Sequence, residues 1–258
     1  MAAIILSLSG PSSSGKTTLA RLLREIFPHT TILHEDDFYK PEKELPMIKM
    51  SDGKEYRDWD CTESLDLDEL EKTIDYIHEH GKLPPNPYSK EDQNFAGPSG
   101  VSPSLIASYR TQVLASPTLS RLLSDDHPLF ILDGFLLYTP ALSCICQKLD
   151  IKLFLLSSFE AGKSRREQRP GYVTLPEEEF WVDPPRYFEE VVWKHFKEDH
   201  GFLFEDADVE KEVKGDVVKK LNLKVCRGSR EWSMSMILGW AFGEVVGALE
   251  RIENGKKE

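Results

Sequence analysis

The chain has 258 residues, 40% of them hydrophobic, and its 32 Lys and Arg against 44 Asp and Glu give a formal net charge of −12. This length and composition are typical of a globular protein, and we expect residues 1–258 to form a single domain. The acidic balance disfavours nucleic acid as a partner, because phosphate backbones are bound by clustered Lys and Arg. No apolar run approaches the ~18 residues that span a bilayer, so we expect no membrane partner either.

Short apolar segments alternate with amphipathic ones along the chain. We expect strands at residues 3–8, 30–34, 129–133, 151–156 and 222–226, and helices at residues 16–27, 66–80, 104–116, 159–168, 186–200 and 231–252. Buried strands separated by helices are typical of a parallel sheet covered on both faces. The predicted fold class is therefore α/β, with a central parallel sheet flanked by helices.

The first expected strand leads directly into a phosphate-binding sequence. Residues 10–18 read Gly-Pro-Ser-Ser-Ser-Gly-Lys-Thr-Thr, which matches GxxxxGK[ST] between a strand and a helix. Glycines let backbone N–H groups face phosphate oxygens, and the helix adds its positive end. Lys16 can reach the β- and γ-phosphates, and Thr17 offers a hydroxyl to Mg²⁺. The predicted nucleotide-binding residues here are Gly10, Ser13, Ser14, Gly15, Lys16, Thr17 and Thr18.

The second expected strand ends in three consecutive acids, Glu35, Asp36 and Asp37. They lie at the carboxyl end of a strand, where α/β sheets bind ligands. A carboxylate at this edge can accept the proton of an attacking hydroxyl and lie near Mg²⁺. A solvated loop with an Asx turn is the structural alternative.

Trp59 and Asp60 follow in a polar stretch. An aromatic ring beside a carboxylate can form a platform for a ring and an anchor for sugar hydroxyls. Trp59 is equally compatible with packing against the core. Farther along, residues 84–104 are rich in Pro, Gly and Ser, which predicts a surface insertion.

The third expected strand is apolar up to Asp133, which precedes Gly134. This Walker-B-like pattern indicates a carboxylate that holds a metal directly or through water. A strand that ends in an Asp-Gly turn is the alternative interpretation.

An arginine cluster occupies the helix expected at residues 159–168. Arg165 and Arg169 are four residues apart and share a face, whereas Arg166 points about 100° away. Guanidinium groups suit the charge spread over a transferring phosphoryl group, so Arg165 and Arg169 can clamp ATP while Arg166 turns to the acceptor. A solvated basic face is the alternative. We expect the Pro-punctuated residues 165–185 to act as a lid.

Cysteines and histidines give no metal-binding pattern. The four cysteines are scattered, and we interpret them as reduced thiols. His78, His80, His195 and His200 lack metal-ligand spacing with a third partner, so we expect solvated or capping positions for them.

Together these segments resemble the uridine kinase-like group of P-loop kinases, and within it the nicotinamide riboside kinase family. The resemblance covers most of the chain as far as Trp193, and its last two segments are similar to fungal members in particular. The segments that carry it are Gly10–Thr18, Glu35–Lys40, Trp59–Asp60, Leu132–Leu137, Arg165–Arg169, Gly171–Leu175 and Phe180–Phe188.

The resemblance implies a P-loop kinase fold with a lid, and transfer of the γ-phosphate of ATP to the 5′-hydroxyl of nicotinamide riboside for NAD synthesis. Whether nicotinic acid riboside is also an acceptor is left open. By resemblance, Lys16 holds phosphates, Thr17 and Asp36 serve Mg²⁺, and Asp36 is also the proton acceptor. Asp133 is shorter than the Glu that some relatives carry, which leaves open whether it contacts the metal directly.

The resemblance also implies an acceptor site. Asp60 and Arg166 would anchor the ribose, and Trp59 and Tyr172 would face the nicotinamide ring. That ring is a pyridinium cation, which aromatic faces attract electrostatically. Arg165 and Arg169 would belong to the lid over ATP.

Two other functions fit part of these residues. A uridine or cytidine kinase would use the same scaffold but recognise base edges by hydrogen bonds. A non-catalytic nucleotide-binding regulatory protein would carry a vestigial site. A GTPase is disfavoured because no Asn-Lys-x-Asp signature occurs. We expect small-molecule substrates as partners and residence in the cytoplasm, with additional nuclear residence and the oligomeric state left open.

Overall fold

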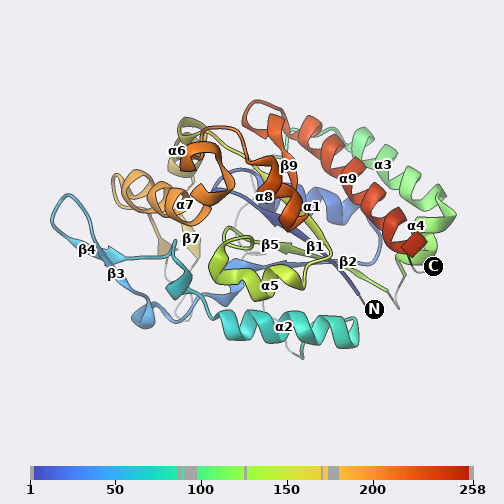
Figure 1. Cartoon of the computed structure of the whole chain (residues 1–258), viewed down its shortest axis with the longest axis horizontal. Coiled ribbons are helices and arrows are strands. Elements are labelled where there is room, and N and C mark those ends of the chain that lie inside the picture. Colours follow the sequence, from blue (N-terminus) through green and yellow to red (C-terminus); the bar gives the residue numbers. More distant parts are fainter. Residues whose placement is uncertain are drawn as a thin grey trace.

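The computed structural model describes residues 3–85, 89, 98–124, 127–169, 171–173 and 180–255. At its centre lies a five-stranded sheet with the strand order β2-β5-β1-β6-β9 (Figure 1). Each neighbouring pair of strands is parallel, which confirms the predicted parallel α/β sheet. The strands are β1 (Ile4–Ser9), β2 (Thr30–His34), β5 (Leu129–Asp133), β6 (Ile151–Leu155) and β9 (Lys224–Cys226).

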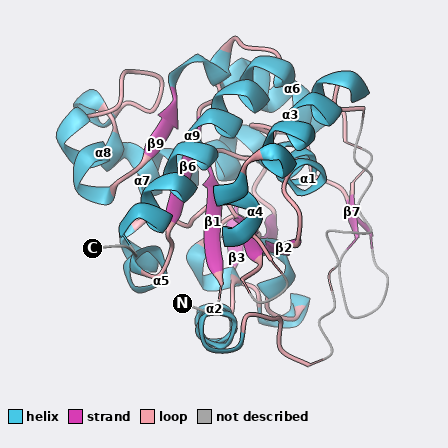
Figure 2. Cartoon of the chain, turned by 90° about the vertical axis from the view of Figure 1, so that its right-hand side faces the viewer, coloured by secondary structure: helices cyan, strands magenta, loops and turns pink. Residues whose placement is uncertain are grey.

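Helices cover both faces of this sheet. They are α1 (Lys16–Ile26), α2 (Leu67–His80), α3 (Pro103–Ala115), α4 (Pro117–Leu122), α5 (Ser143–Gln147), α6 (Phe159–Glu167), α7 (Trp193–His200), α8 (Gly215–Leu221) and α9 (Met234–Gly255). In Figure 1, α2 and α5 lie below β1, β2 and β5, and α3 and α9 lie above these strands. Figure 2 shows α2 below the same strands and α9 on the side that faces the viewer.

The two faces follow from the alternation of side chains along a strand. In β1, Ile4, Leu6 and Leu8 pack into one buried cluster with residues of α1, α3, α4 and α9. Ile5 packs into the other cluster, with residues of α2, α5 and α7. A strand buried on both sides is therefore mostly apolar, with only the small side chains of Ser7 and Ser9 as exceptions in β1, which is why its position is readable from the sequence.

Helix α2 shows how local chemistry fixes an element boundary. Asp66 is its N-cap, and its carboxylate accepts a hydrogen bond from the backbone N–H of Glu69 at 3.0 Å. Gly81 ends the helix in the left-handed conformation that favours glycine. The apolar stripe between these ends faces the sheet, with Leu70, Ile74 and Ile77 fully buried.

Several short elements escape the sequence pattern. A small antiparallel hairpin pairs β3 (Met47–Lys49) with β4 (Glu55–Arg57), and a second pairs β7 (Tyr172–Val173) with β8 (Phe180–Trp181). Strands this short show no readable periodicity. The helix expected at residues 186–200 begins instead with a π-helical turn at Phe188–Val192, in which the Trp193 N–H bonds to the Phe188 carbonyl oxygen.

The region expected to be a surface insertion, residues 84–104, falls largely outside the described residues. Its last two positions belong to α3, whose N-cap Ser102 accepts from the Leu105 N–H. Part of the expected lid, residues 165–185, also lies outside the described part of the chain, and that prediction stays untested.

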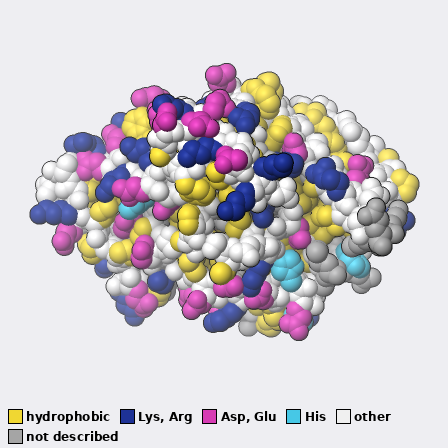
Figure 3. Space-filling view, in the orientation of Figure 1, with side chains coloured by type: hydrophobic (Ala, Val, Ile, Leu, Met, Phe, Trp, Pro, Cys, Tyr) yellow, Lys and Arg dark blue, Asp and Glu magenta, His cyan; other side chains and the backbone are white. Residues whose placement is uncertain are grey.

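Surface charge is mixed where it is visible. On the face shown in Figure 3, Lys and Arg side chains are interspersed with Asp and Glu. Within the described residues, no helix is both long and apolar enough to cross a membrane.

The carboxyl ends of β1, β2 and β5 meet at one edge of the sheet. Leu8 of β1 and His34 of β2 both stand in register with Asp133 of β5. This edge gathers the loop after β1, the acids after β2 and the turn after β5.

Gly134 is required at this edge because a side chain has no room there. A Cβ atom on Gly134 would lie 2.6 Å from Oε2 of Glu35 and 2.8 Å from its Cβ.

We expect Gly134→Ala to lower the free energy of unfolding by roughly 1–3 kcal/mol, measured by denaturant titration. The matched control is Gly243→Ala in α9, where nothing lies within 4 Å of the added Cβ. There the better helix propensity of Ala should raise stability by ~0.5–1 kcal/mol. Equal losses in the two variants would contradict this account.

Candidate active site

The loop between β1 and α1 has a backbone that only certain residues can adopt. Gly10 has a φ of 145°, and a Cβ there would lie 2.4 Å from the Leu155 carbonyl oxygen. Ser13 and Gly15 also have positive φ values, of 62° and 97°. Gly15 is the N-cap of α1, so the loop ends at the positive end of that helix.

This loop contains buried polar groups that a ligand could hydrogen-bond. Within the described residues, the hydroxyls of Ser13 and Ser14 are buried without a hydrogen-bond partner. Lys16 donates from Nζ to the carbonyl oxygens of Gly10 at 3.0 Å and Pro11 at 3.1 Å. Burial lowers the pKa of Lys16, and the charges of Asp133 and Asp36 oppose that shift. Buried hydroxyls, a desolvated ammonium and a helix N-terminus fit a bound phosphate.

Asp133 connects three elements at the sheet edge. Its Oδ2 accepts from the Thr17 hydroxyl at 2.6 Å and lies 3.3 Å from Nδ1 of His34. Although burial alone would raise the pKa of Asp133, the His34 hydrogen bond and the Lys16 charge lower it. An ionised carboxylate beside a threonine hydroxyl is the oxygen chemistry that Mg²⁺ prefers. Its Oδ1 is buried and has no partner among the described residues, which fits a ligand atom at that position.

Asp36 lies next to these groups in the 3₁₀ turn Glu35–Phe38. It is partly exposed, unlike the fully buried Glu35 before it. The Asp36 charge raises the pKa of Lys16, so the carboxylate is within electrostatic reach of the phosphate-binding loop. A partly exposed carboxylate at this edge can both approach a metal and accept a proton.

Glu35 turns inward instead of joining the other two acids. Its Oε2 accepts from the backbone N–H groups of Phe135 at 2.6 Å and Leu136 at 3.1 Å. Burial raises its pKa from 4.5 to about 7, although these hydrogen bonds act in the opposite direction. Glu35 thereby ties the end of β2 to the turn after β5, a role that the sequence did not reveal.

The arginine cluster divides between two partners. Nη1 of Arg165 donates to the Ser13 carbonyl oxygen at 3.2 Å, which brings α6 against the phosphate-binding loop. The Arg169 charge lowers the pKa of Lys16, so it also acts near this loop. Arg166 pairs with Asp60, and its Nη1 also donates to the hydroxyl of Ser12 in the same loop at 2.9 Å. Arg166 alone of the three is paired with Asp60 in the described residues, but the helix ends at Glu167, before Arg169.

Arg166 and Asp60 form a buried pair that a third residue joins. Nη1 and Nη2 of Arg166 donate to the two carboxylate oxygens of Asp60 at 3.1 and 3.2 Å. Nε of Arg166 also donates to Oδ2 of Asp183 at 2.6 Å. Burial raises the pKa of Asp60, and the Arg166 charge opposes this.

Trp59 belongs to an aromatic cluster. Its side chain is 8% exposed, and its ring lies 5.2 Å from Tyr39 and 5.9 Å from Trp181. The Trp59 backbone N–H donates to the Tyr187 hydroxyl at 3.0 Å. Tyr172 is paired in register with Trp181, but its side chain lies outside the described part of the chain. The structure thus supports the packing interpretation of Trp59 while placing it beside Asp60.

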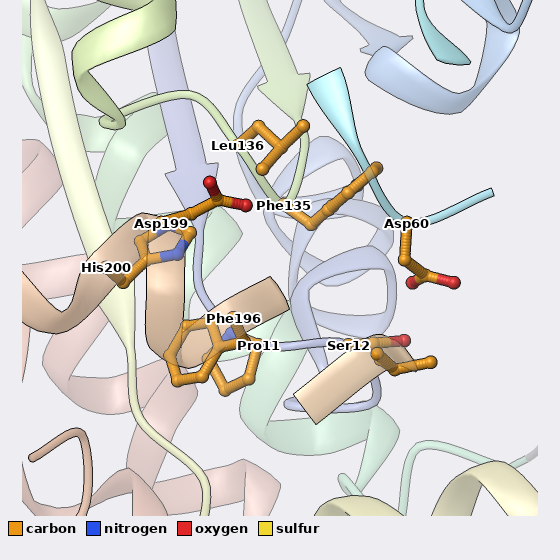
Figure 4. Close-up of a pocket in the computed structure, with 9 residues that line it drawn as sticks. Pro11, Ser12, Asp60, Phe135, Leu136, Phe196, Asp199 and His200 are labelled. Carbon is orange, nitrogen blue, oxygen red and sulfur yellow. The ribbon is translucent and has the colours of Figure 1, made fainter. Parts of the chain in front are cut away.

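A small pocket opens next to Asp60 (Figure 4). Pro11 and Ser12 of the phosphate-binding loop form one wall, and Phe196, Asp199 and His200 of α7 form another. Phe135, Leu136 and Val192 complete the lining. The pocket therefore connects the loop, the turn after β5 and α7.

The expectation of solvated or capping histidines was wrong for two residues of α7, of which His200 lines the pocket. His200 is 1% exposed and its ring lies 4.7 Å from that of Phe196, so burial lowers its pKa to about 3 and keeps it neutral. His195 is 2.7 Å from Oδ2 of Asp58, and this hydrogen bond raises the pKa of His195. Oδ1 of Asp58 accepts the Asp60 N–H at 3.1 Å, so the pair links α7 to the Asp60 backbone.

The pKa of Glu35 gives a testable dependence of stability on pH. The folded state retains a proton between about pH 4.5 and 7 that the unfolded state has lost, so stability falls as pH rises through that window. Glu35→Gln keeps an acceptor for the two N–H groups but does not titrate. We expect its stability relative to the native protein to rise by roughly 3 kcal/mol between pH 4 and 8, measured by urea denaturation. The exposed control Glu63→Gln should show no such trend, and a flat difference for Glu35→Gln would contradict the assignment.

No family model matches the chain. Individual proteins do match it. One from Schizosaccharomyces pombe named nicotinamide riboside kinase is 38% identical, over 96% of this chain and 98% of that protein. A protein of the same name from Saccharomyces cerevisiae is 33% identical, over 94% of this chain and 95% of its own. A mouse protein named nicotinamide riboside kinase 2 is 29% identical, over 75% of this chain and 78% of its own.

Proposed function

This chain belongs to the nicotinamide riboside kinase family, and we propose that it transfers the γ-phosphate of ATP to the 5′-hydroxyl of nicotinamide riboside. The product would be the mononucleotide used in NAD synthesis. One observation carries the proposal: the phosphate-binding loop, the Thr17–Asp133 pair and the Asp60–Arg166 pair lie together at one edge of the sheet. Phosphoryl transfer needs such positioned charges more than covalent protein chemistry.

The phosphate side of the site rests on the loop after β1. Backbone N–H groups of the loop, with the hydroxyls of Ser13 and Ser14, would bind the phosphates of ATP. Lys16 would exchange its two carbonyl contacts for phosphate oxygens, and the Arg165 guanidinium lies close enough to the loop to join it. Mg²⁺ would be held by Thr17, Asp36 and Asp133, and would neutralise phosphate charge during transfer.

The acceptor side rests on residues between the loop and the aromatic cluster. Asp36 would accept the proton of the 5′-hydroxyl as the new P–O bond forms. Asp60, with Arg166, would bind ribose hydroxyls beside the loop. Trp59 and Tyr172 would contact the pyridinium ring, which aromatic faces attract.

Product formation with a panel of acceptors tests this function. The purified protein is incubated with Mg-ATP and nicotinamide riboside, nicotinic acid riboside, uridine or cytidine, and Lys16→Ala serves as the blank. We expect selective turnover of the pyridine ribosides. Preferential turnover of pyrimidine nucleosides would keep the phosphate chemistry and overturn the acceptor assignment. A lack of turnover with every acceptor would favour a regulatory nucleotide-binding protein.

Asp36→Asn tests the proton acceptor directly. The amide keeps the shape of the side chain but cannot take the proton, so we expect kcat to fall by about 10²-fold or more. The affinity for ATP, measured by calorimetry, should stay within about threefold of the native value because the phosphate-binding loop is intact. Near-native turnover by Asp36→Asn would show that another group accepts the proton.

A further inference from the structure

The guanidinium of Arg166 is fully engaged by protein groups. Nε donates to Oδ2 of Asp183 at 2.6 Å, and Nη2 donates to Oδ1 of Asp183 at 3.2 Å. The two carboxylate oxygens of Asp60 take one hydrogen bond from Nη1 and one from Nη2, and the Ser12 hydroxyl takes another from Nη1 at 2.9 Å. These contacts account for all five N–H donors that a guanidinium has. Arg166 therefore acts in this arrangement by holding carboxylates.

Asp183 and Asp60 bind two adjacent edges of the same planar group, which share Nη2. Asp183 takes the Nε edge with both of its oxygens, and Asp60 takes the edge formed by Nη1 and Nη2. Such forked contacts fix the plane of a guanidinium as well as its position. The orientation of Asp60, which lines the pocket beside the phosphate-binding loop, thus depends on Asp183.

The three side chains carry one net negative charge. Asp60 and Asp183 contribute two negative charges and Arg166 one positive charge, and the side chains are only 8%, 20% and 7% exposed. The neighbouring carboxylate of Asp58 has a partner of its own in His195, whose pKa is raised by this hydrogen bond. A charge that is poorly screened by solvent acts strongly on a ligand nearby.

Asp183 also connects this charge to the aromatic cluster. Nε1 of Trp181 donates to Oδ1 of Asp183 at 2.8 Å, and the Trp181 ring lies 5.9 Å from that of Trp59. Aromatic faces and a cluster whose three side chains carry a net negative charge both favour a cationic ring over a neutral one.

We propose that Asp183 is a positioning residue that determines substrate specificity. It orients Asp60 through Arg166, and it gives the cluster of Asp60, Arg166 and Asp183 the net negative charge that selects a cationic nucleoside over a neutral one. This inference rests on the proposed function, and it names the residues that would give the protein its preference for a cationic substrate. It also gives Arg166 the role of holding Asp60 in the orientation that meets the ribose.

The test compares two acceptors that share the ribose and the carboxamide but differ in the charge and aromaticity of the ring. Nicotinamide riboside is a cation, and its reduced dihydropyridine form keeps the ribose and carboxamide but is neutral. We measure kcat and KM for both acceptors with the native protein, Asp183→Asn, Asp183→Glu and the exposed control Asp68→Asn, together with the KM for ATP and the melting temperature. Uridine serves as a second neutral acceptor.

We expect Asp183→Asn to lower kcat/KM for the cation about tenfold, mainly through KM, which corresponds to about 1.4 kcal/mol. The value for the neutral acceptors should change by less than about twofold, and the KM for ATP should not change. Asp183→Glu should recover most of the preference because it restores the charge, and Asp68→Asn should match the native protein. The preference of the native protein for the cation should also weaken as salt is added.

Other outcomes separate the two proposals. Equal losses for cationic and neutral acceptors in Asp183→Asn would show a merely structural role and overturn this inference. An unchanged preference in a variant that melts normally would overturn it as well, while leaving the proposed function in place. A native protein that prefers neutral nucleosides would contradict both.

Discussion

The site depends on how the ends of two neighbouring strands are joined. At the end of β2, Glu35 holds the turn after β5 through two backbone N–H groups, and the missing side chain of Gly134 is what lets it approach. At the end of β5, Asp133 reaches the first turn of α1 through Thr17. Because these contacts are buried, neither strand end can shift without leaving polar groups unpaired, which is costly away from water. The loop and the acids therefore hold one relative arrangement.

Much of this arrangement was predictable from the sequence because it is local. A strand buried on both faces is mostly apolar, so the five strands of the sheet and their parallel pairing follow from short, largely apolar runs between helices. The phosphate-binding loop is one continuous stretch whose spacing has a mechanical reason. The separation of Arg166 from Arg165 is likewise set by the helical repeat alone.

The remaining features depend on contacts between distant segments, for which a single sequence has no signal. Nothing in the run of three acids shows that Glu35 turns inward, since that depends on the backbone of residues about a hundred positions away. Asp183 gains its importance from a guanidinium in another element, and His195 from Asp58. His200 was expected to be solvated, but two aromatic rings surround it. Pattern arguments place elements well, but they do not find the side chains that connect them.

The π-helical turn at Phe188–Val192 lets the start of α7 absorb a change in chain length. A π-turn holds one residue more than an α-turn, so losing a residue there would let the segment revert to a continuous α-helix. Because the wider turn takes up its extra residue locally, the residues on either side would keep their faces. His195 and Asp199 would then still lie on the side of the helix that faces Asp58 and the pocket. Over evolution, this segment should therefore tolerate the loss of one residue more readily than the regular part of α7, where a deletion rotates the flanking residues by about 100°.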